Sequence, residues 1–157
     1  MTRAFRPDTP ALSITHHIGR PFRKSIKTTL HGAEISEQEI DDLAAYLTSL
    51  PPPPVVQRQN SDDVYLGFEL FRSHGCVNCH AGETYTSDRS VDVGLKDELG
   101  HTLFNPPSLH GVAHRRKLFH DGRADSLEEV LGRFQHQLKR PHSDSDRHRL
   151  IQFLKSL

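Results

Sequence analysis

The two cysteines of this chain lie three positions apart, and a histidine directly follows the second. Cys76, Cys79 and His80 spell C-x-x-C-H, the pattern at which c-type haem is attached. Two thiols at this spacing can add to the two vinyl groups of one haem, and the next imidazole then lies beneath the iron as its proximal ligand. The sequence therefore predicts one covalent haem c, with its iron bound by His80.

Two other interpretations of these cysteines are a zinc knuckle and a redox-active dithiol. A zinc site built on one C-x-x-C needs a second ligand pair at short spacing, and none of the twelve histidines forms an H-x3–5-H pair in an apolar helix. A redox dithiol normally follows a buried strand, and no Val/Ile-rich run precedes Cys76. Haem attachment is favoured, and a non-haem metal-binding module remains as an alternative.

Composition narrows the classes of partner. Twenty basic and twenty acidic side chains balance, so the net charge does not indicate nucleic acid or a membrane surface. Hydrophobic residues make up 34% of the chain, and no apolar run is long enough to span a membrane. Residues 1–13 lack the apolar stretch of a signal peptide, yet haem is normally attached outside the cytoplasm. We therefore expect a periplasmic protein whose export signal is not visible in this sequence.

An internal repeat predicts two related domains. Residues 36–50 align with residues 143–157 without a gap, and five of the fifteen positions are identical. Residues 17–20 resemble residues 120–123 in the same order, which makes a chance likeness of two amphipathic helices a poorer explanation. We therefore expect residues 1–50 to be the C-terminal part of a first cytochrome c-like domain, with its haem motif absent from this chain.

The first clear helix is predicted to begin at Ser36. Ser36 and Glu39 form a capping box, in which each side chain satisfies a backbone N–H near the other residue. Four consecutive prolines, residues 51–54, end this helix and begin a stiff segment. We predict an interdomain linker over residues 51–61 and a cytochrome c domain over residues 62–157.

The predicted fold is all-α, with long loops around the haem and no strand. A short helix is expected over residues 23–30, and residues 81–118 are expected to be mostly loop because Gly, Asp, Ser and Pro dominate them. The helices of the haem domain are predicted to begin at capping residues, which are Asp62 or Asp63, Ser126 with Glu129, and Ser143.

Six short pieces of the chain share the pattern of one family. They are Gly67-x3-Phe71, C-V-N-C-H at 76–80, P-S-L at 107–109, F-H-D-G-R at 119–123, S-L-E-E-V at 126–130 and L-I-Q-F-L-K-S-L at 150–157. In these pieces the chain resembles the bacterial di-haem cytochrome c peroxidase family. Residues 64–157 resemble its C-terminal haem domain, and residues 17–50 resemble the end of the preceding domain. The resemblance implies that this domain passes electrons to a catalytic haem in the first.

The sixth iron ligand separates an electron carrier from a catalyst, because an open position admits peroxide. The family often has a methionine here, but the one methionine of this chain is Met1. Motif position and the suitability of imidazole for iron make His136 the candidate distal ligand. His120 is the weaker candidate, followed by His114 and His110.

Arginines are candidates for the haem propionates, since a guanidinium binds a carboxylate through two parallel hydrogen bonds. Arg123 and Arg115 are placed for this role, with a solvated surface arginine as the alternative. No Ser-His-Asp set, phosphate loop or H-E-x-x-H motif indicates hydrolase or nucleotide chemistry.

Three classes of function follow. An electron-transfer cytochrome c is favoured, with a redox protein or a small electron donor or acceptor as its partner. A di-haem peroxidase-type oxidoreductase is the second, and a non-haem metal-binding module is the third. The sequence indicates no oligomeric state.

Overall fold

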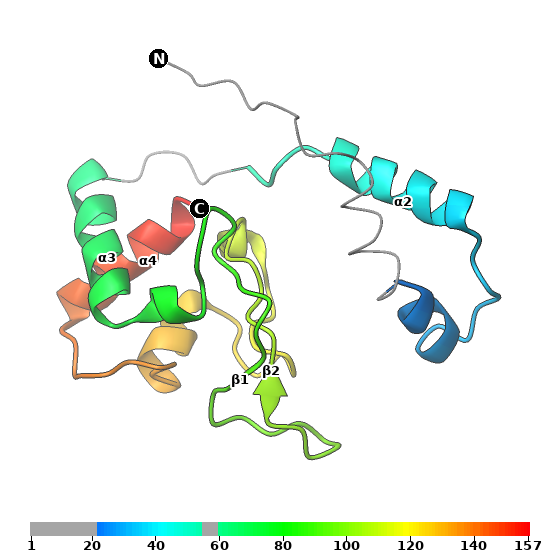
Figure 1. The fold of residues 1–157 in the computed structure, drawn as a ribbon. Coiled ribbons are helices and arrows are strands. Elements are labelled where there is room, and N and C mark those ends of the chain that lie inside the picture. The colour runs from blue at the N-terminus through cyan, green and yellow to red at the C-terminus, as the bar shows by residue number, and fades with distance from the viewer. Residues whose placement is uncertain (1–21, 55–59) are drawn as a thin grey trace. The chain divides into compact units, whose positions relative to one another are not determined.

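The computed structural model describes residues 22–54 and 60–157. The chain divides into two compact units, Met1–Pro51 and Pro52–Leu157. In the first unit, residues 22–28 are helical and α2 spans Glu37–Ser49 (Figure 1).

The capping box predicted at the start of α2 is present. Ser36 caps the helix, its hydroxyl accepts from the backbone N–H of Glu39, and the Glu39 carboxylate accepts from the backbone N–H of Ser36 at 2.8 Å. Ile40 and Ala44 are the buried side chains of this helix. The repeat segment at residues 17–20 lies outside the described residues.

In the second unit, the described residues form two α-helices, three shorter helical turns and a small ribbon of strands. In chain order these are α3 (Ser61–Ser73), the 3₁₀ turn η1 (Cys76–Asn78), β1 (Val91–Asp92), β2 (Leu103–Phe104), the 3₁₀ turn η2 (Val112–His114), the π-helix η3 (Glu129–Arg133) and α4 (Asp144–Lys155). Figure 1 shows α3 and α4 packed against each other.

The predicted all-α class is confirmed, although the structure adds the ribbon of β1 and β2. The two strands pair antiparallel, with Val91 opposite Phe104. Strands of two residues leave no alternating pattern in the sequence, which is why they were not predicted. Within the described residues, no helix has the length and apolar character that a membrane span requires.

The start of α3 differs from the prediction, which named Asp62 or Asp63 as the cap. Asn60 caps the helix, and its side-chain oxygen accepts from the backbone N–H groups of both aspartates. The aspartates lie in the first turn, where carboxylates interact favourably with the positive end of the helix dipole. The cap of α4 is the predicted Ser143, and Asp146 completes its capping box.

Helices α3 and α4 cross at Gly67. A Cβ atom added there would lie 2.8 Å from the Cβ of Phe153 and well inside the contact distance of the Arg149 carbonyl oxygen. Neither of these atoms can turn aside, because one is backbone and the other is the first atom of its side chain. The absence of a side chain at position 67 therefore sets the separation of the two helices.

Aromatic rings fill the core beside this crossing. The ring of Phe153 lies 5.4 Å from that of Phe68 and 5.2 Å from that of Phe71. Tyr85, from the loop after the C-x-x-C-H motif, packs edge-on against Phe71 at 6.1 Å and against Phe153 at 6.0 Å. Tilted and edge-to-face arrangements are the favourable ones for such rings. The loop that follows the motif is thus fixed to the same core as the helices.

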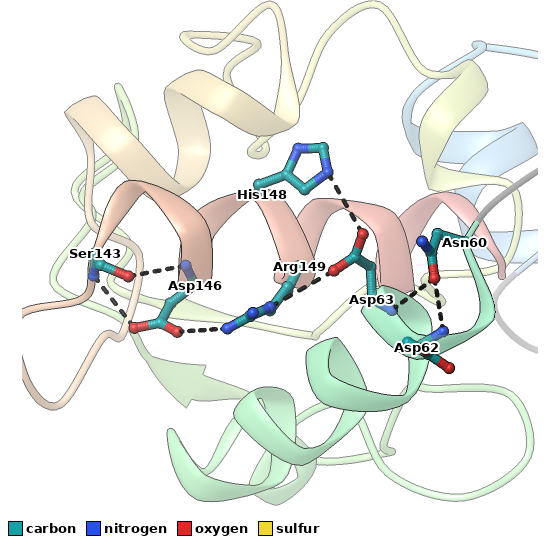
Figure 2. A network of polar contacts seen from close by, with 7 residues as sticks. All are labelled: Asn60, Asp62, Asp63, Ser143, Asp146, His148 and Arg149. Atoms are coloured by element: carbon teal, nitrogen blue, oxygen red, sulfur yellow. Dashed lines mark hydrogen bonds and ion pairs between the residues drawn. The ribbon is translucent and has the colours of Figure 1, made fainter.

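A polar network links the same two helices at their surface (Figure 2). Arg149 of α4 lies between two carboxylates, with its Nε 3.6 Å from Asp63 and a terminal nitrogen 3.7 Å from Asp146. His148 adds a contact of 4.0 Å to Asp63. Such partly exposed ion pairs contribute at most about 1 kcal/mol each. The network aligns the helices more than it stabilises them.

Replacing Gly67 with alanine is expected to destabilise the chain by about 2 kcal/mol or more, because the added methyl group forces α3 and α4 apart. The measurement is the free energy of unfolding in urea. Gly132→Ala is the matched control, since a Cβ there would find its nearest neighbour, Arg147 Cδ, at 3.7 Å. Equal stability of Gly67→Ala and the native chain would contradict the close crossing.

Candidate haem-binding site

Two residues, His74 and Gly75, join α3 to the C-x-x-C-H motif, and the second has a left-handed backbone. His74 ends the helix, Gly75 has φ of 80°, and the chain then enters the 3₁₀ turn η1 at Cys76. Glycine adopts this conformation without the steric cost of a Cβ atom. The backbone N–H groups of Cys79 and His80 both donate to the Cys76 carbonyl, at 3.2 and 2.9 Å. The two thiols and the imidazole are therefore held in a single tight turn.

The imidazole of His80 is oriented by two backbone carbonyls. Its Nδ1 lies 3.1 Å from the carbonyl oxygen of Tyr85 and 3.1 Å from that of Pro107. Carbonyls only accept, so Nδ1 carries the proton and Nε2 keeps its lone pair for a metal. Burial lowers the pKa of His80, although these two hydrogen bonds act in the opposite direction. The ring is thus in the tautomer that an iron ligand requires.

Further hydrogen bonds hold the two carbonyls in place. The Ser108 hydroxyl donates to the carbonyl of Thr84 at 2.6 Å, and the Asn105 amide donates to that of Ser87 at 2.7 Å. The Thr86 hydroxyl donates to the carbonyl of Pro106. These contacts join the loop after the motif to the predicted Pro-Ser-Leu segment. That segment therefore has an identifiable task, which is to present a carbonyl to the proximal histidine.

The first cysteine of the motif is a partly buried thiol. Burial raises the pKa of the Cys76 thiol to about 11. A catalytic dithiol instead depends on a lowered pKa that produces a thiolate near neutral pH. The environment of Cys76 therefore does not support the dithiol interpretation. Among the described residues, no group of three or more His, Cys, Asp and Glu side chains is arranged to hold a metal ion.

His136 lies at the end of an irregular helix. The segment predicted as a helix from Ser126 is helical at residues 127–128 and then becomes the π-helix η3. The Ser126 hydroxyl accepts from the Glu129 N–H as predicted, but the Glu129 carboxylate accepts from the N–H of Asp125 rather than from that of Ser126. π-Helical turns are frequent at functional sites because the extra residue per turn shifts the side chains that follow.

The backbone on both sides of His136 is strained. Gln135 and Gln137 have φ of 45° and 53°, and the N–H of His136 donates to the Val130 carbonyl at 3.1 Å. Left-handed conformations cost a non-glycine residue about 1–2 kcal/mol each. Strain of this kind tends to gather where function fixes the position of a side chain. Here two strained residues bracket one histidine.

The ring of His136 lies among aromatic side chains. Phe119 is edge-on to it, with ring centroids 5.2 Å apart, and to Phe134 at 5.3 Å. Burial lowers the pKa of His136, and the charge that His80 would carry lowers it further. The structure thus brings the candidate distal ligand into the electrostatic neighbourhood of the proximal one, with both rings neutral at neutral pH.

The other candidates have local partners. The exposed ring of His120 is stacked on Phe104 with centroids 4.1 Å apart. Arg123 pairs with Asp121 of its own turn, which raises the pKa of Arg123 through that hydrogen bond.

Arg115 and the two remaining histidine candidates bind backbone carbonyls. Arg115 donates to the carbonyl of Ser108 at 2.8 Å. The rings of His110 and His114 lie within hydrogen-bonding distance of the carbonyls of Glu83 and Pro54, at 2.7 and 2.6 Å. The propionate role of Arg123 and Arg115 stays a prediction.

The carbonyls of Tyr85 and Pro107 were missed as parts of the site. Any residue supplies a carbonyl, so the sequence carries no signal for Tyr85, whose backbone is also left-handed at φ of 49°. The Pro-Ser-Leu segment was noticed as a motif but was given no chemical task. Phe119, also left-handed at φ of 64°, was recognised only as part of F-H-D-G-R.

The helical fold, the C-x-x-C-H turn and the carbonyl-bound histidine define a cytochrome c-type haem domain. The model of the di-haem cytochrome c peroxidase family matches residues 63–156, and the chain belongs to this family, which confirms the resemblance seen in the sequence.

Two curated proteins are similar to this chain. The methylamine utilization protein MauG of Methylorubrum extorquens is 32% identical over 60% of this chain and 34% of its own length. Cytochrome c551 peroxidase of Nitrosomonas europaea is 28% identical over 62% of this chain and 34% of its own length. The chain thus spans 34% of the length of each of these relatives.

One buried histidine lies beside the motif without a role in it. His74 is 2% exposed, and its Nδ1 has no hydrogen-bond partner among the described residues. Burial lowers its pKa, the charges of Arg140, His142 and Lys139 lower it further, and Asp146 opposes them. The ring is therefore neutral in the folded chain at neutral pH.

This burial predicts a loss of stability in mild acid. The unfolded chain takes up a proton at His74 near the ordinary pKa of 6.5, whereas the folded chain does so only at lower pH. The free energy of unfolding should therefore fall as the pH drops below that value, because the unfolded state binds more protons. His74→Leu should make this fall shallower, as measured by urea unfolding at about pH 8 and pH 5. An identical pH dependence in the variant would contradict a buried neutral ring.

Proposed function

We propose that this chain forms the electron-relaying haem c domain of a di-haem cytochrome c peroxidase-type oxidoreductase. One observation carries the proposal: His80 and His136 are two half-buried imidazoles whose pKa values burial lowers, and the charge that His80 would carry lowers the pKa of His136 further, within a fold of this family. Cys76 and Cys79 would attach the haem, and the two histidines would bind its iron. When bound, the haem supplies one-electron iron(III)/iron(II) chemistry.

The protein side chains have distinct tasks in this scheme. His80 would bind the iron through Nε2, and its Nδ1–H···O=C contacts keep the ring orientation and increase its basicity as a ligand. His136 would be the second imidazole ligand, which would keep peroxide from the iron and suit the site to outer-sphere electron transfer. Two histidines favour a lower reduction potential than a histidine and a methionine. The residues present fit a relay site better than a catalytic one.

A free-standing electron carrier is the alternative that the sequence favoured. The family is that of the di-haem cytochrome c peroxidases, and one of the two relatives is named as a cytochrome c551 peroxidase. This supports a domain that works beside a second haem. In the proposed scheme, electrons enter the protein at this domain and pass from it to a second haem that reduces peroxide. The complete protein acts outside the cytoplasm.

The first test is expression of the chain with a haem-attachment system. We expect the denatured mass to increase by one haem and the reduced spectrum to show the sharp α band of low-spin iron. Cys76→Ser with Cys79→Ser should abolish the covalent mass increase, because no thiol remains for the vinyl groups. The native chain without covalent haem would overturn the proposal, and sustained peroxide turnover by its single haem would contradict the relay role.

The second test concerns the distal ligand. His136→Ala should convert the low-spin spectrum to a high-spin one, because water or an open position replaces a strong-field imidazole. His120→Ala is the matched control, since its stacked and exposed ring should leave the spectrum unchanged. A low-spin spectrum in His136→Ala, or a high-spin one in His120→Ala alone, would remove His136 from the site.

A further inference from the structure

Although the net charge of the chain is balanced, acidic and basic side chains are concentrated in different segments of the haem domain. Residues 81–102 contain five acidic and two basic side chains, whereas residues 133–149 contain five basic side chains, two acidic ones and three histidines. Like charges gathered on one part of a surface produce a local field even where the total is zero. The basic segment includes the turn that joins η3 to α4.

Two residues of this turn lie against the haem-attachment motif. A Cβ atom added at Gly75 would be 2.6 Å from Lys139 Nζ, so this ammonium covers the glycine that opens the motif. The same ammonium is close enough to Cys76 to favour its thiolate. Arg140 donates to the Ser73 hydroxyl at 3.0 Å. Lys139 and Arg140 therefore flank the turn that carries the first haem-bonding thiol.

Both cations are exposed, and within the described residues neither has a carboxylate partner. Seven of the described cations of the same unit do have one, namely Arg72, Lys117, Arg123, Arg133, Arg147, Arg149 and Lys155. Besides its hydrogen bond to Ser73, Arg140 has an electrostatic role, because a positive charge near the C-terminus of α3 interacts favourably with the negative end of the helix dipole. No such role accounts for Lys139.

We propose that Lys139 and Arg140 form the centre of a docking surface for an acidic one-electron redox protein. The inference rests on the proposed function, because it requires a haem attached at Cys76. Charge complementarity carries it: two cations without a carboxylate partner among the described residues lie beside the haem-attachment motif, where they would attract a negative surface. The haem held at Cys76 and Cys79 would accept one electron from the reduced partner, so that the partner is oxidised and iron(III) is reduced to iron(II).

The test uses the haem-loaded full chain and a reduced acidic flavodoxin as the protein probe. The variant Lys139→Glu with Arg140→Glu is compared with Lys96→Glu and Arg116→Glu, which makes the same change in net charge at exposed positions elsewhere. Stopped-flow absorbance gives the second-order rate constant of haem reduction. At low salt we expect the first variant to be slower by about tenfold or more and the control by less than about twofold. The salt dependence of the native rate should largely disappear in the first variant.

A small cationic reductant, the radical cation of methyl viologen, separates docking from a change at the iron. Its rate should not fall in either variant, because a small cation gains nothing from a basic surface. Equal slowing of both variants with flavodoxin would overturn the proposal, since net charge alone would then explain it. Slowing of the first variant with reduced methyl viologen by the same factor would also overturn it. Failure of the native chain to bind haem would refute the proposed function instead, and that outcome is visible before any rate is measured.

Discussion

The close approach of α3 and α4 at Gly67 is the constraint on which the rest of the haem domain depends. The motif begins three residues after the last residue of α3, so the position of this helix sets the position of both thiols. Tyr85 packs against rings from both helices, and its carbonyl is one of the two that orient His80. A shift of α3 relative to α4 would thus displace His80 in two ways, through the packing of Tyr85 in the core and through the backbone that joins α3 to the motif.

Features with a local chemical cause could be predicted from the sequence. The C-x-x-C-H motif, the capping box of Ser36 with Glu39 and the start of α4 at Ser143 depend on residues within a few positions of each other. The family also follows from short motifs. Asn60 shows the limit of this reasoning, because each of the four consecutive polar residues 60–63 could cap α3 and the sequence alone does not rank them.

Other features depend on residues that are distant in the chain or on the backbone itself. The carbonyl of Pro107 reaches His80 across a long loop, and no side chain marks that contact. The π-helical register of η3 and the left-handed glutamines beside His136 arise from packing that overrides local preference. The choice of His136 as distal ligand, which rests on motif position, stays a prediction, because an irregular helix leaves the distance in sequence from a recognisable turn unchanged.

The means by which His80 is oriented has a consequence for how this domain can change over generations. Both hydrogen-bond acceptors belong to the main chain, and a single substitution cannot delete a carbonyl as it can delete a carboxylate or an amide. Side chains of the surrounding loop can therefore vary wherever they do not hold its path, as Thr86, Asn105 and Ser108 do. Insertions and deletions, which alter that path, are the changes to which the iron ligand would be vulnerable.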